Sequence, residues 1–512
     1  MAMIDINNLT FSYDGSSTYV FEGISFRFDT DWKLGFVGRN GKGKTTFLRL
    51  LMGEYEYSGS ISSSEAFRYF PASIPTGSWD EMAITLLQDA FPDREDWMIL
   101  REVNLMGMDA ELLYRPWATL SFGERTRIML CCLFAGENEF LLIDEPTNHL
   151  DEKSREAVKD YLRSKNGFIL VSHDRDILDA VTDHTLAFNR TSIEVVRGNF
   201  TTWWDNKQQR DQSEAAQNEN LKRDIKRLED AARKASARAD HIESQKIGTD
   251  PIKDHDRSIS TRAYLGAKSK KLQQGKKNME KRQAREIDQK KSLLRDAEKT
   301  ESLKIHPVPY RTNTIIRMKD LSLKYEDSNR ELLHNICAEI NNGDRVLLKG
   351  ANGSGKSSLI KVILRMLGST HEDVKGSEKI LTTGELYVAP GVTVSYLSQD
   401  TSNMHGTPAE YALSRGIDRT LFFTILRKLD FEPDAFDADI STYSEGQKKK
   451  TAIAASLSMS SNIYIWDEPL NYVDIFSRMQ FESLLMEYKP TMLVVEHDKY
   501  FADKVATKVI EL

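Results

Sequence analysis

Residues 38–45 read GRNGKGKT, and residues 350–357 read GANGSGKS. Each stretch fits the pattern G-x-x-x-x-G-K-[ST], in which glycines let successive backbone N–H groups wrap around phosphate groups. Each also follows a strand-like run, LGFVG or VLLKG, and precedes a helix-like run. Because a helix presents its positive end to an anion at its N-terminus, the two stretches predict two phosphate-binding loops.

The last residues of the two loops have specific expected roles. Lys44 and Lys356 are expected to reach the β- and γ-phosphates of a nucleotide, and the hydroxyls that follow them to lie on Mg²⁺. The full set of expected nucleotide contacts is Gly38, Asn40, Gly41, Gly43, Lys44, Thr45 and Thr46 in the first loop and Gly350, Asn352, Gly353, Gly355, Lys356, Ser357 and Ser358 in the second.

Two further stretches recur in the same order after each loop. LLIDEPTNHLD at 141–151 returns as IYIWDEPLNYVD at 463–474, and LVSHD at 170–174 returns as VVEHD at 494–498. The offsets between the copies are 312 residues for the loop lysines, 323 for the glutamates and 324 for the histidines, which indicates a duplicated domain. Short apolar runs such as FLLID and MLVVE predict buried parallel strands, so the fold class is α/β.

Polar side chains follow these predicted strands in both copies. Asp144 and Asp467 end hydrophobic runs, where a carboxylate that organises Mg²⁺ belongs. Glu145 and Glu468 follow directly and are candidates to orient or deprotonate the attacking water. The residues that end the next strand, where they would contact the γ-phosphate, are His173 and His497.

The sequences LSFGE at 120–124 and YSEGQ at 443–447 each begin 25 residues before a candidate glutamate. Together with the loops and the repeated stretches, they resemble the ATP-binding-cassette (ABC) superfamily over residues 1–204 (cassette 1) and 306–512 (cassette 2). The resemblance implies two tandem ABC-type P-loop ATPase domains that use ATP and Mg²⁺. It also implies a monomer whose two cassettes pair head to tail.

Head-to-tail pairing would place each signature sequence on the opposite nucleotide. The first signature, with Ser121 and Gly123, would cap the nucleotide held by the second loop. The second signature, with Ser444 and Gly446, would cap the nucleotide held by the first. The residues that match the family's adenine-stacking aromatic are Tyr13 and Tyr325, for which core packing is the alternative role.

Several positions depart from the family pattern. Gln399 follows SYLS at the family's glutamine position and is expected to contact Mg²⁺, whereas Ala72 occupies that position in the first half. The other departures are Phe122 and Glu445 in place of a signature glycine, and Tyr472 where the first half has His149. The two sites are therefore expected to be unequal, although both keep the lysine, aspartate, glutamate and histidine of a hydrolytic site.

Residues 205–305 form a charged segment between the cassettes. It holds 26 Lys+Arg and 18 Asp+Glu, and residues 257–285 hold ten basic residues and one acidic residue. A heptad pattern followed by a turn-rich stretch and a sparser second stripe predicts an antiparallel α-helical hairpin linker with its tip in 248–264, rather than a solvated spacer. The two stripes are Leu221, Ile225, Leu228, Ala232, Ala235, Ala239 and Ile242, and Leu265, Leu272 and Met279.

The composition of the chain bears on its partners and on the cell compartment in which it is expected. The formal net charge is -7, so a nucleic-acid partner would have to meet the basic linker rather than the acidic remainder. The N-terminus has no secretory signal pattern, and no run approaches the ~18 apolar residues that cross a membrane. Three cysteines without metal-ligand spacing fit a reducing compartment. A cytoplasmic protein without a membrane partner is expected.

Two cassettes in tandem, joined by a two-helix linker, resemble the ABC-F group. Three other ABC layouts are less similar: a transporter ATPase subunit, a DNA-repair ATPase with metal-binding insertions, and a chromosome-structuring ATPase with a far longer coiled coil. The ABC-F resemblance implies a ribosome partner, with the linker entering at the tRNA exit site and reaching toward the peptidyl-transferase centre and the peptidyl-site tRNA. The basic stretch 257–285 suits ribosomal RNA.

Within ABC-F, the resemblance leaves two functions open. From Ala72 to Ser121 there are 49 residues, against 45 from Gln399 to Ser444, so the extra arm of many housekeeping members is at most vestigial. DEPLNYVD at 467–474 resembles resistance members that act on lincosamides, streptogramin A and pleuromutilins. The expected function is therefore antibiotic resistance by ribosome protection, with a housekeeping translation factor as the alternative.

Overall fold

The computed structural model describes residues 3–15, 19–72, 74, 79–148, 150–188, 193–247, 303–326, 331–351, 353–369, 374 and 377–512. The chain divides into two compact units. One unit spans Met1–Trp203 and Thr300–Leu512 and holds both cassettes, and the other spans Trp204–Lys299. Each cassette combines a mainly parallel sheet with helices, which confirms the α/β fold class.

A six-stranded sheet forms the centre of cassette 1, in the order β5-β6-β7-β3-β8-β9. All neighbouring strands are parallel except β8 and β9. Every residue of β7 is buried, as are four of the six in β6, so these strands read as continuous apolar runs. The strand bounds are β3 (Lys33–Gly38), β5 (Ala66–Phe70), β6 (Glu139–Asp144), β7 (Phe168–Val171), β8 (His184–Phe188) and β9 (Ile193–Arg197).

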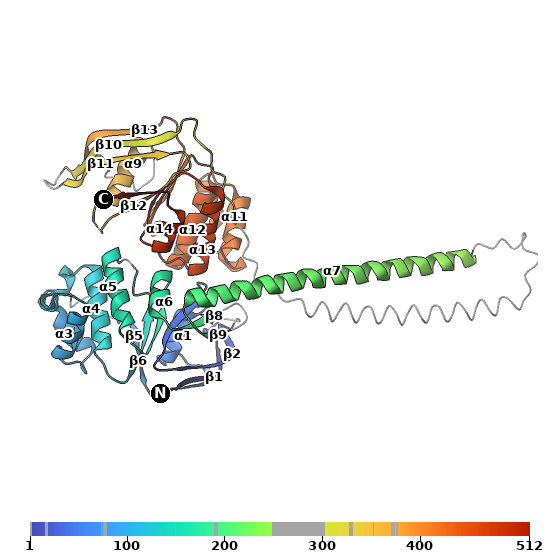
Figure 1. The fold of residues 1–512 in the computed structure, drawn as a ribbon, viewed down its shortest axis with the longest axis horizontal. Coiled ribbons are helices and arrows are strands. Elements are labelled where there is room, and N and C mark those ends of the chain that lie inside the picture. Colours follow the sequence, from blue (N-terminus) through green and yellow to red (C-terminus); the bar gives the residue numbers. More distant parts are fainter. Residues whose placement is uncertain are drawn as a thin grey trace, which may run out of the picture. The chain divides into compact units, whose positions relative to one another are not determined.

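A smaller antiparallel sheet and a set of helices complete cassette 1. The small sheet has the order β2-β1-β4, with bounds β1 (Met3–Phe11), β2 (Phe21–Asp29) and β4 (Ser58–Ser62). The helices are α1 (Lys44–Leu51), α2 (Ala83–Ala90), α3 (Asp96–Leu105), α4 (Phe122–Phe134), α5 (Glu152–Arg163) and α6 (Arg175–Val181). In Figure 1, α3, α4 and α5 lie together on one side of the cassette.

Cassette 2 repeats the plan with a five-stranded parallel sheet, in the order β14-β15-β16-β12-β17. Its strands are β12 (Arg345–Lys349), β14 (Val394–Leu397), β15 (Ile463–Asp467), β16 (Met492–Val495) and β17 (Lys508–Glu511). A three-stranded antiparallel sheet lies beside it, in the order β11-β10-β13, with bounds β10 (Thr314–Tyr325), β11 (Glu331–Asn341) and β13 (Ile380–Val388).

The helices of cassette 2 are α9 (Lys356–Met366), α10 (Pro408–Ser414), α11 (Arg419–Lys428), α12 (Glu445–Ser458), α13 (Ile475–Tyr488) and α14 (Lys499–Val505). In Figure 1, α9 lies beside the antiparallel sheet, whereas α11 to α14 gather away from it. Apolar side chains of α9 and the two sheets form one core cluster, and those of α10 to α13 form another. Because the parallel strands end on the same edge of their sheet, the polar residues after β12, β15 and β16 come together there.

The signature sequences act as helix starts in both cassettes. Ser121 caps α4, and Ser444 caps α12, each in a capping box with the residue three positions later. Two cysteines, Cys131 and Cys132, are buried on α4, whereas Cys337 on β11 is exposed.

The residues of the first predicted stripe lie within α7 (Phe200–Ile247), a single helix of 48 residues. At 1.5 Å per residue it is about 70 Å long. Ile225, one member of the predicted heptad stripe, is buried. The predicted tip, 248–264, and the second stripe, 265–279, lie outside the described residues. Among the helices of the described ranges, none has the length and apolar character needed to cross a membrane.

Candidate active sites

The two phosphate-binding loops have the same backbone geometry. In the first loop, Gly41 and Gly43 have φ values of 79° and 85°, and in the second Gly353 and Gly355 have 78° and 100°. A Cβ on Gly43 would come within 2.7 Å of Val20 Cγ1, so this position also needs glycine for space. Each loop leads directly into a helix, α1 or α9, whose N-terminus faces the loop. Asn352 lies outside the described residues.

Each loop lysine lies inside its own loop. Lys44 Nζ donates to the carbonyls of Gly38 at 2.7 Å and Arg39 at 3.2 Å. Lys356 Nζ donates to the carbonyls of Gly350 and Ala351, both at 2.8 Å. Burial lowers the pKa of both ammonium groups. The two charges are thus held where the loop amides would surround phosphate oxygens.

The residues predicted for Mg²⁺ are adjacent in both sites. Thr45 Oγ1 donates to Asp144 Oδ2 at 2.9 Å, and burial raises the pKa of Asp144. In the second site burial raises the pKa of Asp467 to about 6, although a hydrogen bond from Ser357 opposes that rise. Asp467 Oδ1 is buried and has no hydrogen-bond partner among the described residues. Since Mg²⁺ prefers carboxylate and hydroxyl oxygens, this oxygen set fits the ion.

Site 1, the site of the Lys44 loop, pairs a glutamate with a histidine. Glu145 Oε1 lies 3.5 Å from His173 Nε2, and the His173 backbone N–H donates to Glu145 Oε2 at 3.3 Å. Burial, followed by the nearby Asp144, raises the pKa of Glu145 to about 8. Burial, followed by Lys44, lowers the pKa of His173 well below its usual range. The pair therefore offers one carboxyl that can take a proton and one neutral imidazole.

Site 2, the site of the Lys356 loop, surrounds its glutamate with amides instead. Glu468 Oε2 accepts from Gln399 Nε2 and from Asn471 Nδ2, each at 2.7 Å. Burial, followed by Arg155, lowers the pKa of His497 to about 4. The sequence indicated unequal sites, and the two glutamates do have different hydrogen-bond partners.

Cassette 2 approaches the first loop directly. Asn40 Nδ2 donates to the backbone carbonyl of Tyr472 at 2.9 Å. A Cβ on the signature Gly446 would lie 2.7 Å from Asn40 Nδ2 and 2.6 Å from the Tyr472 oxygen. The signature that begins at Ser444 therefore starts its helix beside the opposite loop, as head-to-tail pairing requires.

Site 2 contains a cavity of about 410 Å³. Cassette 2 supplies most of its wall, including Lys356, Glu468 and His497, and cassette 1 supplies Leu150 and Arg155. The remaining lining residues are Tyr325, Leu332, Gly353, Gly355, Ser357, Ser358, Gln399 and Asn471.

The first signature makes its closest contacts within cassette 1. Ser121 Oγ donates to Glu124 Oε2 at 2.8 Å, and its backbone N–H donates to the same oxygen at 2.7 Å. A Cβ on Gly123 would meet Leu150 Cδ2 at 3.3 Å. Because Leu150 lines the cavity of site 2, the first signature abuts the cavity wall through that residue.

The two predicted adenine-stacking tyrosines lie at the surface. Tyr13 shares a hydrogen bond with Thr46 Oγ1 at 2.6 Å, and Tyr325 shares one with Ser358 Oγ at 3.1 Å. Both residues are exposed, at 43% and 39%. Each hydroxyl is thus tied to the helix after its loop while the ring remains available to a planar base.

Four of the residues that depart from the family pattern, or that correspond to such a position, lie in the described part of the chain. The side chain of Ala72 is a methyl group and offers no ligand to a metal, and its backbone N–H donates to Met129 Sδ at 3.2 Å. Phe122 is exposed, and Glu445 pairs with Lys448 at 3.1 Å. Tyr472 has a φ of 62°, and His149 lies outside the described residues.

Three residues in these sites have no counterpart among the predictions. Tyr69 donates its hydroxyl to Asp144 Oδ2 at 3.0 Å, on the side where the first cassette lacks the family's glutamine. Asn471 donates to Glu468, and Arg155 reaches site 2 from cassette 1. Tyr69 lies among the aromatic residues of β5, and nothing in the sequence around it singles out its hydroxyl.

Comparisons with known proteins agree with this arrangement. The ABC transporter family matches twice, at residues 21–148 and 333–471. The chain is 25% identical to the ribosome protection protein VmlR of Bacillus subtilis (strain 168), over 96% of this chain and 84% of that protein. It is 26% identical to the energy-dependent translational throttle protein EttA of Haemophilus influenzae (strain ATCC 51907 / DSM 11121 / KW20 / Rd), over 96% of this chain and 89% of that protein.

A solved structure has a similar fold. The crystal structure of the complex of archaeal ribosomal stalk protein aP1 and archaeal ribosome recycling factor aABCE1 aligns with a TM-score of 0.56. The alignment covers 94% of this chain and 83% of that chain at 18% identity, so it bears on the fold alone. The two family matches together cover more than half of the chain and include both loops and both Asp-Glu pairs. The chain therefore belongs to the ABC transporter family, with two cassettes, and is an ATPase.

Proposed function

We propose that this ATPase is an ABC-F protein that binds the ribosome and protects the peptidyl-transferase centre from antibiotics. The observation that carries the proposal is the domain architecture of the chain. Two cassettes of one polypeptide meet at the first loop through Asn40 and Tyr472, and the 48-residue helix α7 follows cassette 1 directly. The relatives named for ribosome protection and for a translational throttle span nearly the whole chain, which supports a ribosomal partner.

ATP would control the ribosome-binding form of the protein. A nucleotide bound at either loop would lie between the two cassettes, since site 1 faces Gly446 of cassette 2 and cassette 1 supplies part of the wall of site 2. A ligand shifts a two-state equilibrium by its differential affinity for the two states. ATP therefore favours the paired cassettes, the paired form fits the ribosome, and hydrolysis at Glu145 and Glu468 releases the protein.

The basic part of the linker supplies the expected ribosomal contact. Residues 257–285 carry ten Lys or Arg and one acidic residue, whereas the whole chain has a net charge of -7. Phosphate backbones attract such a segment and release counterions on binding. In this proposal the linker enters at the tRNA exit site, meets ribosomal RNA and the peptidyl-site tRNA, and its tip at 248–264 displaces the drug.

A housekeeping translation factor is the second candidate. The chain is as similar to the translational throttle EttA, at 26% identity, as to the ribosome protection protein VmlR, at 25%. Both functions use the same ATPase and the same ribosomal site. They differ in whether the protein changes the sensitivity of translation to drugs.

The first test removes hydrolysis and keeps nucleotide binding. The double variant Glu145→Gln, Glu468→Gln exchanges each carboxylate for an amide of the same shape, so it should bind ATP and remain on ribosomes. Co-sedimentation with purified ribosomes, with and without ATP, measures this. Lys44→Ala with Lys356→Ala is the matched control that should not bind nucleotide. A double glutamine variant that sediments free of ribosomes in ATP contradicts a ribosomal function of the closed state.

The second test separates protection from housekeeping. The protein is added to a membrane-free translation extract with a panel of drugs that bind the peptidyl-transferase centre. Rescue of translation in the extract supports protection. Cells that express the protein should then show raised inhibitory concentrations of these drugs without altered drug accumulation. An effect on translation that is equal with and without drug indicates the housekeeping function. Changed drug accumulation alone indicates a transporter subunit.

A further inference from the structure

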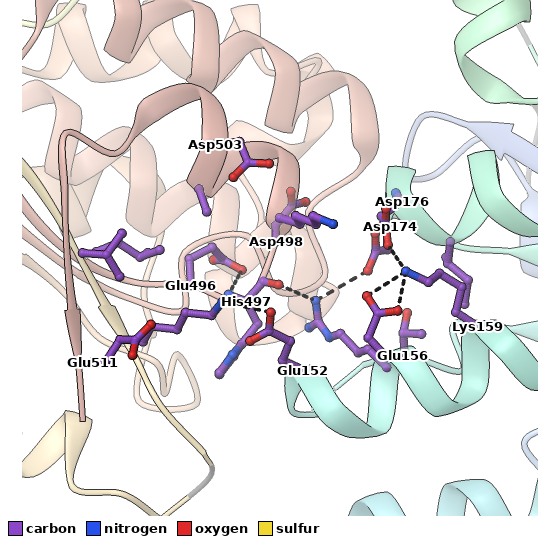
Figure 2. Close-up of a pocket in the computed structure, with 18 residues that line it drawn as sticks. Glu152, Glu156, Lys159, Asp174, Asp176, Glu496, His497, Asp498, Asp503 and Glu511 are labelled. Carbon is purple, nitrogen blue, oxygen red and sulfur yellow. Dashed lines mark hydrogen bonds and ion pairs between the residues drawn. The ribbon is translucent and has the colours of Figure 1, made fainter. Parts of the chain in front are cut away.

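The side chain of Arg155, on α5 of cassette 1, crosses to cassette 2. It borders a cavity of about 280 Å³ whose wall combines α5 and α6 with β12, β17 and α14. Figure 2 shows this cavity. The dashed lines from Asp174 of cassette 1 and from His497 of cassette 2 meet at one arginine side chain, that of Arg155. Arg155 also lines the larger cavity of site 2, so one side chain reaches both spaces.

The guanidinium group of Arg155 is fixed by three contacts. Its Nε donates to the carbonyl of Leu150 at 3.0 Å, and its Nη1 lies 3.6 Å from Asp174 Oδ2. The same Nη1 donates to the backbone carbonyl of His497 at 3.3 Å. Only 15% of the side chain is exposed. Two contacts within cassette 1 therefore orient the group, and the third holds a residue of cassette 2.

The residue that it holds belongs to the reaction site. His497 follows β16 and lines the cavity of site 2 together with Lys356 and Glu468. Its Nε2 is buried and has no hydrogen-bond partner in the described part of the chain. Arg155, after burial, also lowers the pKa of the imidazole, which keeps the ring neutral. An Nε2–H in this position can donate to a phosphate oxygen of a nucleotide in site 2.

The repeat provides an internal comparison. Arg478 holds the same place on α13 as Arg155 on α5, four residues after the aspartate that caps the helix. Its hydrogen bonds go to the carbonyls of Leu470 at 2.8 Å and Val473 at 2.9 Å, and to Asp498 at 3.0 Å. All three partners lie in cassette 2. The arginine of the first cassette thus donates to the opposite histidine, whereas the hydrogen bonds of the second cassette's arginine go to loop and cap residues of its own cassette.

We propose that Arg155 is a positioning residue for hydrolysis in site 2. Arg155 lies in cassette 1 and acts by fixing the backbone of His497 in cassette 2. When the cassettes separate, the contact breaks and the histidine loses its support. Paired cassettes then turn over ATP in site 2, and separated cassettes do not. The inference rests on the ATPase activity and not on the ribosomal function, so either can fail without the other.

Single-site enzymes test the proposal. Glu145→Gln leaves hydrolysis to site 2, and Glu468→Gln leaves it to site 1. Adding Arg155→Gln to the first should lower kcat about tenfold, because small misplacement of a catalytic group is costly. Its KM for ATP should stay within about twofold, since the nucleotide contacts remain. Adding it to Glu468→Gln should change kcat less than about twofold.

Two further variants separate positioning from simple docking. Glu152→Gln removes the ion pair with Lys349, 2.9 Å across the same cavity, and should leave kcat of both single-site enzymes unchanged. Arg155→Lys keeps the charge without the planar fork and should restore only part of the lost rate. Thermal melting of each variant establishes that it is folded.

Several results would overturn the proposal. These are an equal loss of kcat in both single-site enzymes, a loss that Glu152→Gln reproduces, a loss seen only in KM, and no loss at all. If the Glu145→Gln parent turns over too slowly, vanadate trapping of labelled nucleotide in the otherwise unchanged chain replaces it. Arg155→Gln should then reduce trapping at the second loop, and an equal reduction at both loops refutes the proposal.

Discussion

The side-chain amide of Asn40 donates to the backbone carbonyl of Tyr472, with 2.9 Å between Nδ2 and O. The donor belongs to the phosphate-binding loop of cassette 1, and the acceptor lies between β15 and α13 of cassette 2. Tyr472 has a φ of 62°, a backbone shape that turns its carbonyl toward the loop at a cost in strain. Site 1 is thus shaped by both cassettes.

The first loop also forms ion pairs with cassette 2. Arg39 pairs with Asp430, and their side chains are 11% and 21% exposed. Arg39→Gln and Asp430→Asn should each lower the free energy of unfolding by about 1–3 kcal/mol, since an ion pair between largely buried side chains is lost. The double variant should cost little more than one single variant, because the residues act as a pair. Equilibrium denaturation measures all three.

A second pair in the same loop is the matched control. Lys42 and Glu432 lie 3.6 Å apart, but their side chains are 41% and 77% exposed. Lys42→Gln and Glu432→Gln should each cost less than about 1 kcal/mol, because water screens the pair. Additive losses from Arg39 and Asp430, or equal losses from the two pairs, would show that the buried contact does not hold the cassettes together.

Hydrolysis in site 1 should depend on pH through Glu145. Its pKa is raised to about 8, so the carboxyl is protonated below that pH and cannot accept a proton from water. In a Glu468→Gln enzyme, kcat should therefore rise as the pH increases through about 8. His173, whose pKa is lowered, stays neutral in this range and adds no second step. A profile without this rise contradicts Glu145 as the base, and the inflection should be absent from Glu145→Gln.

The two signature glycines should tolerate alanine differently. A Cβ on Gly446 would lie 2.6 Å from the Tyr472 oxygen and 2.7 Å from Asn40 Nδ2, closer than atoms can approach. A Cβ on Gly123 would meet Leu150 Cδ2 at 3.3 Å and Ser154 Oγ at 3.5 Å, which small shifts accommodate. Gly446→Ala should thus lower the melting temperature and the ATPase rate more than Gly123→Ala. Equal effects would mean that the junction at Asn40 is not maintained in solution.

Ribosome association should weaken as salt is added. Neutralising Lys270, Lys271, Lys276 and Lys277 to glutamine should lower the slope of log affinity against log salt by up to about one unit per lysine. Binding to purified ribosomes at several salt concentrations gives the slope. Glutamine at four lysines outside the linker is the control. An unchanged slope would show that these lysines do not contact phosphate.

Residues 252–260 should decide drug protection and not hydrolysis. The stretch lies in the turn-rich part of the linker and carries Ile252, Ile259 and Arg257, which can contact bases or phosphates. Replacing it with a short Gly-Ser turn should leave ATPase activity and ribosome binding largely intact and abolish protection in cells. A shortened protein that still protects fully would refute the tip as the effector.

Much of each site could be predicted from the sequence because the chemistry is local or follows from strand ends. The glycines place Lys44 within its own loop, six residues after Gly38, whose carbonyl it reaches. Asp144 ends β6, and His173 follows β7, so adjacent parallel strands bring Glu145 and His173 to the same edge. Because the domain is duplicated, the same reasoning applies to the corresponding residues of cassette 2.

Other contacts could not be predicted because they depend on docking between distant parts of the chain. Arg155 and His497 are 342 residues apart, and nothing near either one identifies the other as its partner. Asn471 and Glu468 are only three residues apart, but their hydrogen bond depends on the turn after the left-handed Glu468. Tyr69 lies on an otherwise ordinary strand, and only the sheet register places its hydroxyl at Asp144.

The positions of the three cysteines allow the chain to be labelled with a fluorescent dye at one native site. Cys131 and Cys132 are buried on α4, and burial raises the pKa of Cys132 to about 12, so neither presents a reactive thiolate. Cys337 is exposed on β11 of cassette 2. A maleimide dye should therefore label the native chain at Cys337 alone. With one cysteine introduced on the surface of cassette 1, fluorescence energy transfer could follow the separation of the cassettes without removing any native thiol.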